Sequence, residues 1–227
     1  IRGIPAYIVM PENSTKSKLD AVRSYGAEVI LCENSLHARE EELEVILEKT
    51  GAYFLHPYND YRIIAGQSTS AQEFLEQVKD LDIIVTPIGG GGLVSGTLLA
   101  ARYFSPKTEV YGVEPEGANS AFLSFKNKKL WPVPNPDTVC DGLRAGIGEK
   151  NFEIINQNIK DIFCVSDKEA LEAMKLIWER MKIVIEPSCA VPLAGILKNK
   201  PVFQDKRIGV ILTGGNVDFT SLSKFFN

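Results

Sequence analysis

Four consecutive glycines, Gly89–Gly92, are the residues of this 227-residue sequence whose type and spacing first suggest chemistry. They lie in DIIVTPIGGGGLVSGTLLAARYF (residues 82–104), between an apolar run and a helical pattern. A flexible linker is one interpretation, but linkers are not usually flanked by Ile, Val and Leu on both sides. In the other interpretation, a ligand approaches the backbone so closely that any Cβ would collide with it. The flanking residues favour the second.

The position of the glycines indicates the kind of ligand. In an open α/β sheet, ligands bind beyond the carboxyl ends of the strands, where the next helix begins. Backbone N–H groups of Gly89–Gly92 and the positive end of the helix dipole would bind an anion such as phosphate. Two known phosphate motifs are excluded, because Thr97 rather than lysine follows Gly96, and Ser95 stands at the third glycine of G-x-G-x-x-G. The sequence predicts a phosphate site that is neither an ordinary ATPase nor a dinucleotide site.

This interpretation makes Gly91 a test position. A β-branched residue there would place methyl groups where the phosphate should lie, and would also impose a disfavoured φ. We expect Gly91→Val to weaken phosphate binding, and to change the stability of the ligand-free protein less, because no core side chain is removed.

A second strand–glycine unit lies near the other end of the chain, in RIGVILTGGNVD (residues 207–218). Thr213, Gly214 and Gly215 stand at the tip of the expected strand. The Thr213 hydroxyl is an ordinary turn group in one interpretation. In the other, it faces the same crevice as Gly89–Gly92 and offers a neutral hydrogen-bond partner to a ligand ring.

The elements that must position these residues form a regular β/α alternation. Several predicted strands are continuous Val/Ile/Leu runs, which are typical of parallel strands covered on both faces. Helices are predicted over Ser35–Lys49, with Gly51 as the stop, and after Ser166, which forms a capping box with Glu169. The predicted strands are Ala6–Met10, Glu28–Cys32, Ala52–Leu55, Asp82–Ile88, Glu109–Glu114, Asp161–Val165 and Arg207–Thr213.

Composition limits the classes of function. The chain is 44% hydrophobic and 24% charged, with a formal net charge of −4, which is ordinary for one large or two small globular domains. No Lys/Arg cluster is long enough to neutralise a run of phosphates, which argues against nucleic acid, and no apolar run is long enough for a membrane span. The four cysteines are scattered without a C-x-x-C pair, as expected for reduced thiols in a cytoplasmic protein.

The start of the chain is unusual for a domain. The first residue is Ile1, and IRGIPAYIVMP begins in the middle of a helix–strand unit. We therefore expect that an N-terminal portion is absent from this sequence.

At this point the residues carry a family resemblance. In order, IPAYIVMP, YGAEVILCE, HPYNDYRIIAGQSTSAQE, PIGGGGLVSG, VYGVEPEGA, DGLRAGIG, WERMKIVIEPS and LTGGNVD resemble the serine racemase and threonine (serine) dehydratase family. These are pyridoxal-phosphate (PLP) enzymes of fold type II, the tryptophan-synthase-β fold. The resemblance implies open, mostly parallel twisted sheets with helices on both faces, a homodimer and a small amino-acid substrate. It implies two domains: residues 1–51 as an incomplete small domain, and 52–227 as the PLP-binding domain.

The resemblance also implies roles for individual residues. The glycines Gly89, Gly90, Gly91 and Gly92, with the backbone of Leu93, would bind the PLP phosphate. Thr213 would face the pyridine nitrogen, and a neutral hydroxyl there leaves that nitrogen largely unprotonated. Glu186 would lie near the ring, although a solvated carboxylate that caps the next helix is an equally good interpretation.

Two motifs of the family do not occur in this sequence. The Schiff-base lysine of relatives lies in S-F-K-x-R-G-A, and a phosphate-side asparagine lies in S-G-N-H. The family architecture places both ahead of GIPAYIV, on the portion expected to be absent. We therefore predict no catalytic residue in residues 1–227, and expect this stretch alone to be inactive.

A metal site and a nucleotide effector site are also implied, with departures. Relatives bind Mg²⁺ or Ca²⁺ through a Glu, a carbonyl and an Asp, which here correspond to Glu114, Ala118 and Ser120. A serine is a weak neutral ligand, so affinity should fall unless Glu116 compensates. The positions that contact a nucleotide in the racemase branch match Tyr25, Lys182 and Asn216.

Two hypotheses of function follow. In the first, the protein is a PLP-dependent dehydratase that deaminates L-serine, L-threonine or 3-hydroxyaspartate, with serine racemase activity in addition. In the second, it is a catalytically incomplete PLP-fold module with a binding or regulatory role. The tetraglycine stretch and the TGGNVD stretch together favour the first.

Overall fold

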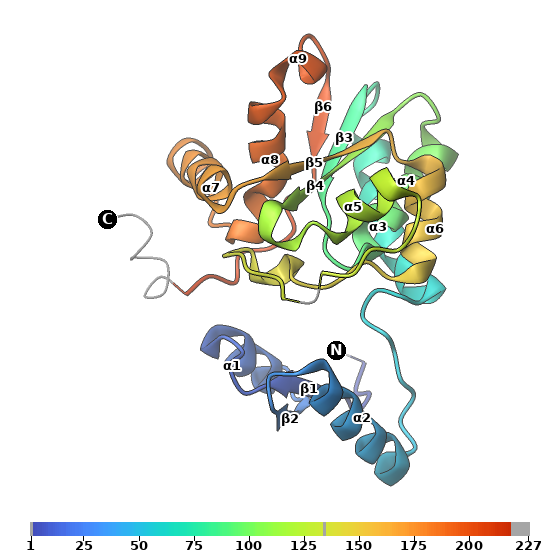
Figure 1. The fold of residues 1–227 in the computed structure, drawn as a ribbon, viewed down its shortest axis with the longest axis vertical. Helices are drawn as coiled ribbons and strands as arrows, with labels where there is room; N and C mark the ends of the chain where they lie inside the picture. The colour runs from blue at the N-terminus through green and yellow to red at the C-terminus, as the bar shows by residue number, and fades with distance from the viewer. Residues whose placement is uncertain (1, 134, 219–227) are drawn as a thin grey trace. The chain divides into compact units, whose positions relative to one another are not determined.

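The computed structural model describes residues 2–133 and 135–218, and it divides them into two compact units (Figure 1). Unit 1 contains the described residues up to Leu55, together with those after Gly215. Unit 2 is His56–Gly215. The assignment of these units to a small domain and a PLP-binding domain, with a boundary near Gly51, stays a prediction.

Unit 1 is a βαβ unit followed by a second helix. Its elements are β1 (Tyr7–Pro11), α1 (Lys16–Ser24), β2 (Glu28–Cys32) and α2 (Leu36–Thr50). Strands β1 and β2 pair in parallel, with Tyr7 opposite Glu28, because α1 returns the chain to the same end of the sheet. Helix α2 begins where the sequence predicts, since Ser35 caps it by accepting a hydrogen bond from the Ala38 amide. It ends at Gly51, which has a φ of 63°.

Unit 2 is built on a four-stranded parallel sheet with the order β5-β4-β3-β6. The strands are β3 (Ile83–Pro87), β4 (Glu109–Pro115), β5 (Asp161–Val165) and β6 (Ile208–Val210). The helices are α3 (Tyr61–Gln77), α4 (Gly92–Phe104), α5 (Ser120–Asn127), α6 (Glu149–Asn158), α7 (Asp167–Met181), α8 (Pro187–Lys198) and α9 (Lys200–Phe203), with the 3-10 turns η1 (Glu116–Ala118) and η2 (Asp141–Leu143).

Helices cover both faces of this sheet. Helix α8 packs against β3, β4 and β5, while α4 contacts β3 and β4 and is itself covered by α3 and α6. Figure 1 shows α7 and α8 to one side of the strands and α3 to α6 to the other. Every residue of β3 is buried, which explains the continuous apolar run in its sequence. The fold class predicted from the sequence is confirmed.

Three local predictions need correction. Residues 52–55 form no strand. Because no sheet covers their apolar side chains, Tyr53 is 68% exposed. The strand expected over Arg207–Thr213 is only Ile208–Val210, because its ladder to β3 ends at Val210. Helical spacing predicts that α7 buries an apolar stripe that ends at Met181, but Met181 is 55% exposed at the end of the helix. The Ser166–Glu169 capping box of α7 is confirmed.

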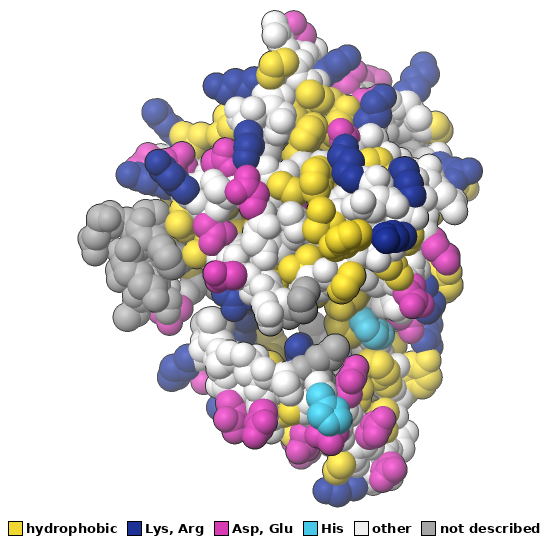
Figure 2. Space-filling model, in the orientation of Figure 1, with side chains coloured by type: hydrophobic (Ala, Val, Ile, Leu, Met, Phe, Trp, Pro, Cys, Tyr) yellow, Lys and Arg dark blue, Asp and Glu magenta, His cyan; other side chains and the backbone are white. Residues whose placement is uncertain are grey.

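The surface agrees with the near-neutral composition. On the face shown in Figure 2, Lys and Arg side chains lie among Asp and Glu side chains and apolar groups. Within residues 2–133 and 135–218, no helix is both long enough and apolar enough to cross a membrane.

Candidate functional site

The tetraglycine loop (Gly89–Gly92) joins the end of β3 to the start of α4. Strand β3 ends at Pro87, and α4 begins at Gly92 with Gly91 as its N-cap residue. Gly91 has φ 95° and ψ −4°, a left-handed conformation that side chains strongly disfavour. The loop therefore lies beyond the carboxyl end of a buried parallel strand, as the sequence predicts.

The backbone amides of this loop are free. In the described part of the chain, the N–H groups from Gly89 to Val94 donate to no backbone or side-chain acceptor, whereas Ser95 N–H donates to Gly91 O at 3.0 Å. No side chain caps α4. A run of unpaired amides at the positive end of a helix dipole suits an anion. The loop thus has the chemistry that a phosphate group requires.

The glycines are needed because the protein's own side chains press on the loop. A Cβ on Gly90 would lie 2.5 Å from Cδ1 of Tyr58, and a Cβ on Gly91 would lie 2.7 Å from Cβ of Asn151. Both distances are far below van der Waals contact. The expectation that Gly91→Val would change the stability of the ligand-free protein less than phosphate binding is therefore wrong, because the new side chain would overlap Asn151 in the ligand-free protein as well.

The turn η2 connects the loop to the start of α8. A Cβ on Gly89 would approach the Leu143 Cα to 3.1 Å, so these backbone segments lie in contact. The Gly142 amide donates to the Ser188 hydroxyl at 3.0 Å, and Ser188 lies in the first turn of α8. These contacts bring the DGL and IEPS segments of the sequence to the same edge of the sheet.

Thr213 lies at this edge as well. Strand β6 pairs in parallel with β3, and Ile211 N–H donates to Val85 O at 3.3 Å, so the chain after β6 runs beside the end of β3. The Thr213 amide donates to the Cys189 thiol at 3.1 Å. Its side chain is exposed. Its hydroxyl, within the described residues, is free to bond a ligand.

Glu186 is the N-cap residue of α8, but its side chain does not cap the helix. Its amide donates to Gly214 O at 3.0 Å. Its Oε1 would lie 3.4 Å from a Cβ on Gly214 and 3.6 Å from a Cβ on Gly142. The carboxylate therefore lies against the glycines of the site edge, and the helix-capping interpretation is not supported.

The three predicted metal positions share one buried turn between β4 and α5, and the side-chain oxygens of Glu114 and Ser120 already accept hydrogen bonds there. The Glu114 carboxyl accepts from the Ala121 amide at 3.0 Å and from the Phe122 amide at 2.7 Å. The Ser120 hydroxyl accepts from the Ile147 amide at 3.0 Å. Burial raises the pKa of Glu114 to about 8, against the lowering effect of the two amides.

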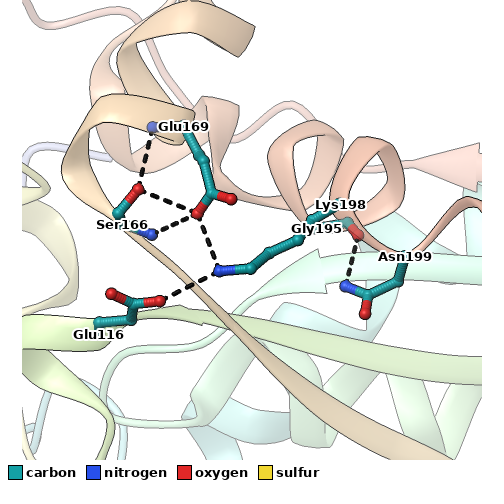
Figure 3. A network of polar contacts seen from close by, with 6 residues as sticks. All are labelled: Glu116, Ser166, Glu169, Gly195, Lys198 and Asn199. Carbon is teal, nitrogen blue, oxygen red and sulfur yellow. Dashed lines mark hydrogen bonds and ion pairs between the residues drawn. The ribbon is translucent and has the colours of Figure 1, made fainter.

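These residues do not fit a divalent cation. Ca²⁺ requires six to eight oxygens, and Mg²⁺ keeps several waters, whereas Glu114 and Ser120 are almost fully buried. Glu116 does not compensate, because it pairs with Lys198 at 3.1 Å (Figure 3). Lys198 also pairs with Glu169 at 2.9 Å, which ties the capping box of α7 to the end of β4. No cluster of three or more His, Cys, Asp or Glu side chains suited to a metal occurs in the described residues.

The predicted nucleotide positions are described one by one. Tyr25 is the C-cap residue of α1 and is exposed. Lys182 ends α7 in a left-handed conformation, and its Nζ donates to Glu179 O at 2.6 Å. Asn216 belongs to unit 1, as Tyr25 does, and Lys182 belongs to unit 2. Their common role stays a prediction.

Sequence reasoning gave no role to Tyr58, Gly142, Asn151 or Ser188. Asn151 had a detectable signal, since a polar residue at this position shares the buried face of α6 with Ile155. Tyr58 had none, because its ring meets the loop through tertiary structure. Near it, His56 Nδ1 accepts from the Asn59 amide at 3.0 Å and shapes the turn before α3.

Comparison with known proteins agrees with this geometry. A family model described as pyridoxal-phosphate dependent enzyme matches residues 1–214. A beta-hydroxyaspartate dehydratase of Paracoccus denitrificans is 47% identical over 222 residues, which are 98% of this chain and 70% of that protein. A serine racemase of Dictyostelium discoideum is 42% identical over 233 residues, and the match covers all of this chain and 71% of that protein. The structure of maize serine racemase superposes with a TM-score of 0.94 at 37% identity, over 99% of this chain and 70% of that one.

Proposed function

The chain belongs to the family of pyridoxal-phosphate dependent enzymes, and on this premise we propose that it is a dehydratase of a β-hydroxy amino acid. The substrate is L-serine, L-threonine or 3-hydroxyaspartate, and the products are a keto acid and ammonia. Serine racemase activity is proposed in addition. One observation carries the proposal: the free amides of the tetraglycine loop and the exposed residue Thr213 follow the carboxyl ends of two neighbouring parallel strands, β3 and β6.

The residues present fit the cofactor. When bound, PLP supplies an electron sink for the substrate α-carbon. The amides of Gly89–Gly92 and Leu93 bind its phosphate with the help of the α4 dipole. The Thr213 hydroxyl would donate a hydrogen bond to the ring nitrogen without giving it a full proton, and such a neutral partner would suit a dehydratase. Glu186, held beside Gly142 and Gly214, adds negative charge to the same edge.

Further parts of the proposal rest on the family resemblance. Unit 2 is proposed as the PLP-binding domain and unit 1 as part of the small domain. The protein is proposed to act as a homodimer, with a nucleotide effector bound through Tyr25, Lys182 and Asn216. We propose a cytoplasmic location, which the four free cysteines support.

The experiment is to purify the natural protein with PLP and to measure keto-acid release from serine, threonine and each 3-hydroxyaspartate diastereomer. The visible absorbance band of protein-bound PLP is recorded in the same samples. We expect bound PLP and keto acid from at least one of these substrates. Bound PLP without turnover or racemisation would favour the incomplete binding module. Absence of bound PLP would contradict both.

A further inference from the structure

Asn151, in the first turn of α6, packs against the tetraglycine loop and donates a hydrogen bond to it. It is fully buried, and its Nδ2 donates to Gly90 O at 2.9 Å and to Tyr58 O at 3.0 Å. Gly90 O accepts a second hydrogen bond from the Gly148 amide at 3.1 Å. One carbonyl of the loop is therefore fixed by two donors from the same segment.

Fixing this carbonyl fixes an amide of the loop. In a planar trans peptide the C=O and the following N–H point in opposite directions. The Gly90 carbonyl points toward the start of α6, so the Gly91 N–H points away from α6. That amide belongs to the unpaired run at the start of α4. The orientation of an anion-binding donor thus depends on a side chain that does not touch the anion.

Asn151 is poorly satisfied by its surroundings alone. Its Oδ1 is buried and has no hydrogen-bond partner in the described part of the protein, and such an acceptor costs free energy. The two carbonyls require both protons of Nδ2, so the amide cannot flip to relieve this cost. Its Cβ also packs where a Cβ on Gly91 would lie. The unpaired Oδ1 indicates that Asn151 is present for the two hydrogen bonds that its Nδ2 donates.

The start of α6 also bonds the residue that follows Tyr58, and the Tyr58 ring packs on the loop. Lys150 N–H donates to Asn59 Oδ1 at 3.0 Å, and the Tyr58 ring packs on Gly90. The start of α6 therefore fastens Tyr58 and the loop to one another through side-chain and backbone bonds.

From these contacts we propose that Asn151 is a positioning residue for the cofactor phosphate: it orients the Gly90–Gly91 peptide so that the Gly91 N–H faces the phosphate. The inference rests on the proposed function in that it takes PLP as the ligand of the loop. It goes further, because it assigns phosphate affinity to a residue that makes no contact with PLP.

The test uses the natural protein in its PLP-free form, with the variants Asn151→Ala and Asn151→Asp. Asn151→Asp keeps the side-chain shape against Gly91 and removes the Nδ2 donors, so it serves even if the alanine variant folds poorly. The control is Asn199→Ala, which removes the hydrogen bond that Asn199 Nδ2 donates to Gly195 O at 2.9 Å at the far end of α8 (Figure 3). Dissociation constants are measured for PLP and for pyridoxal, which lacks the phosphate, together with the unfolding midpoint without ligand.

We expect both Asn151 variants to bind PLP roughly tenfold more weakly or worse, because a charge-assisted hydrogen bond is misdirected. Pyridoxal affinity should change by less than about twofold, because that ligand does not use the phosphate donors. Asn199→Ala should leave both affinities unchanged. Equal PLP affinity in wild type and variants would overturn the inference, and so would an equal loss for PLP and pyridoxal, which indicates a merely structural role. A wild-type protein that binds neither ligand would refute the proposed function first.

Discussion

Strands β3 and β4 lie side by side, and each leads into a helix. The two helices differ in whether the protein supplies a hydrogen-bond acceptor for the backbone amides of the first turn. At the start of α4, the amides of the tetraglycine loop have no acceptor in the described chain. At the start of α5, the amides of Ala121 and Phe122 donate to the buried carboxyl of Glu114. A helix N-terminus becomes a ligand site only where the chain does not supply the acceptor itself.

Glycine makes this difference possible. Around α4, the Tyr58 ring and Asn151 occupy the space behind the loop, so the loop has no room for side chains that could turn back and cap the helix. Around α5, a long acidic side chain from β4 reaches the first turn and satisfies it. The contrast can be tested by adding a side chain to the first terminus and removing one from the second.

The largest effect is expected for Gly91→Ala. The new Cβ would lie 2.7 Å from the Asn151 Cβ at a φ of 95°, so steric overlap and backbone strain should together lower the free energy of unfolding by roughly 4 kcal/mol. Gly66→Ala in α3 is the matched control, since no atom lies within 4 Å of its Cβ position, and it should raise stability by up to about 1 kcal/mol. Chemical denaturation of both variants measures the difference. If Gly91→Ala is as stable as Gly66→Ala, Asn151 does not pack against Gly91 as described.

A smaller effect is expected for Glu114→Ala, which makes the second terminus resemble the first. The Ala121 and Phe122 amides lose their acceptor, and the free energy of unfolding should fall by about 2 kcal/mol. Added sulfate should then restore part of this loss by binding the emptied helix terminus, and it should stabilise the variant more than the wild type. Unfolding curves with sulfate, and with chloride at equal ionic strength, give the comparison. Equal stabilisation of both proteins would show that the α5 terminus cannot become an anion site.

The third test concerns the pH dependence of stability that Glu114 contributes. Burial raises its pKa from 4.5 to about 8 in the folded chain, so between these values the folded state keeps a proton that the unfolded state has lost. Stability from this group is therefore lost as pH rises from about 4.5 to about 8. In Glu114→Gln this contribution should disappear, which makes its unfolding midpoint less sensitive to pH over that range. Parallel pH profiles for wild type and variant would contradict the raised pKa.

The sequence predicted the features that depend on neighbouring residues. The bounds of α2 follow from Ser35 and Gly51, and the start of α7 follows from Ser166 and Glu169, because caps act within a single turn. The tetraglycine loop was correctly placed between a strand and a helix for the same reason. The strand expected over residues 52–55 failed because strand formation requires a partner strand, which an apolar run alone does not reveal.

The supports of the site could not be read in the same way. The contact between Asn151 and Gly90 spans 61 positions and that between Asn151 and Tyr58 spans 93, so no local pattern records them. The role of Glu114 was assigned by resemblance to a metal site, and burial together with two backbone amides gave it a different partner. The sequence thus identified the backbone amides that donate at the site but not the residues that orient them.

The sheet order also determines when this site can exist during synthesis. Strand β3 lies between β4 and β6, and β6 is the last strand of the described chain. As the polypeptide leaves the ribosome, β3 can pair with β4 early, but its other edge stays open until residue 210 has emerged. Thr213 reaches the site edge only after that step. A nascent chain that stalls earlier would carry the glycine amides beside an uncovered apolar strand, the kind of intermediate that chaperones bind.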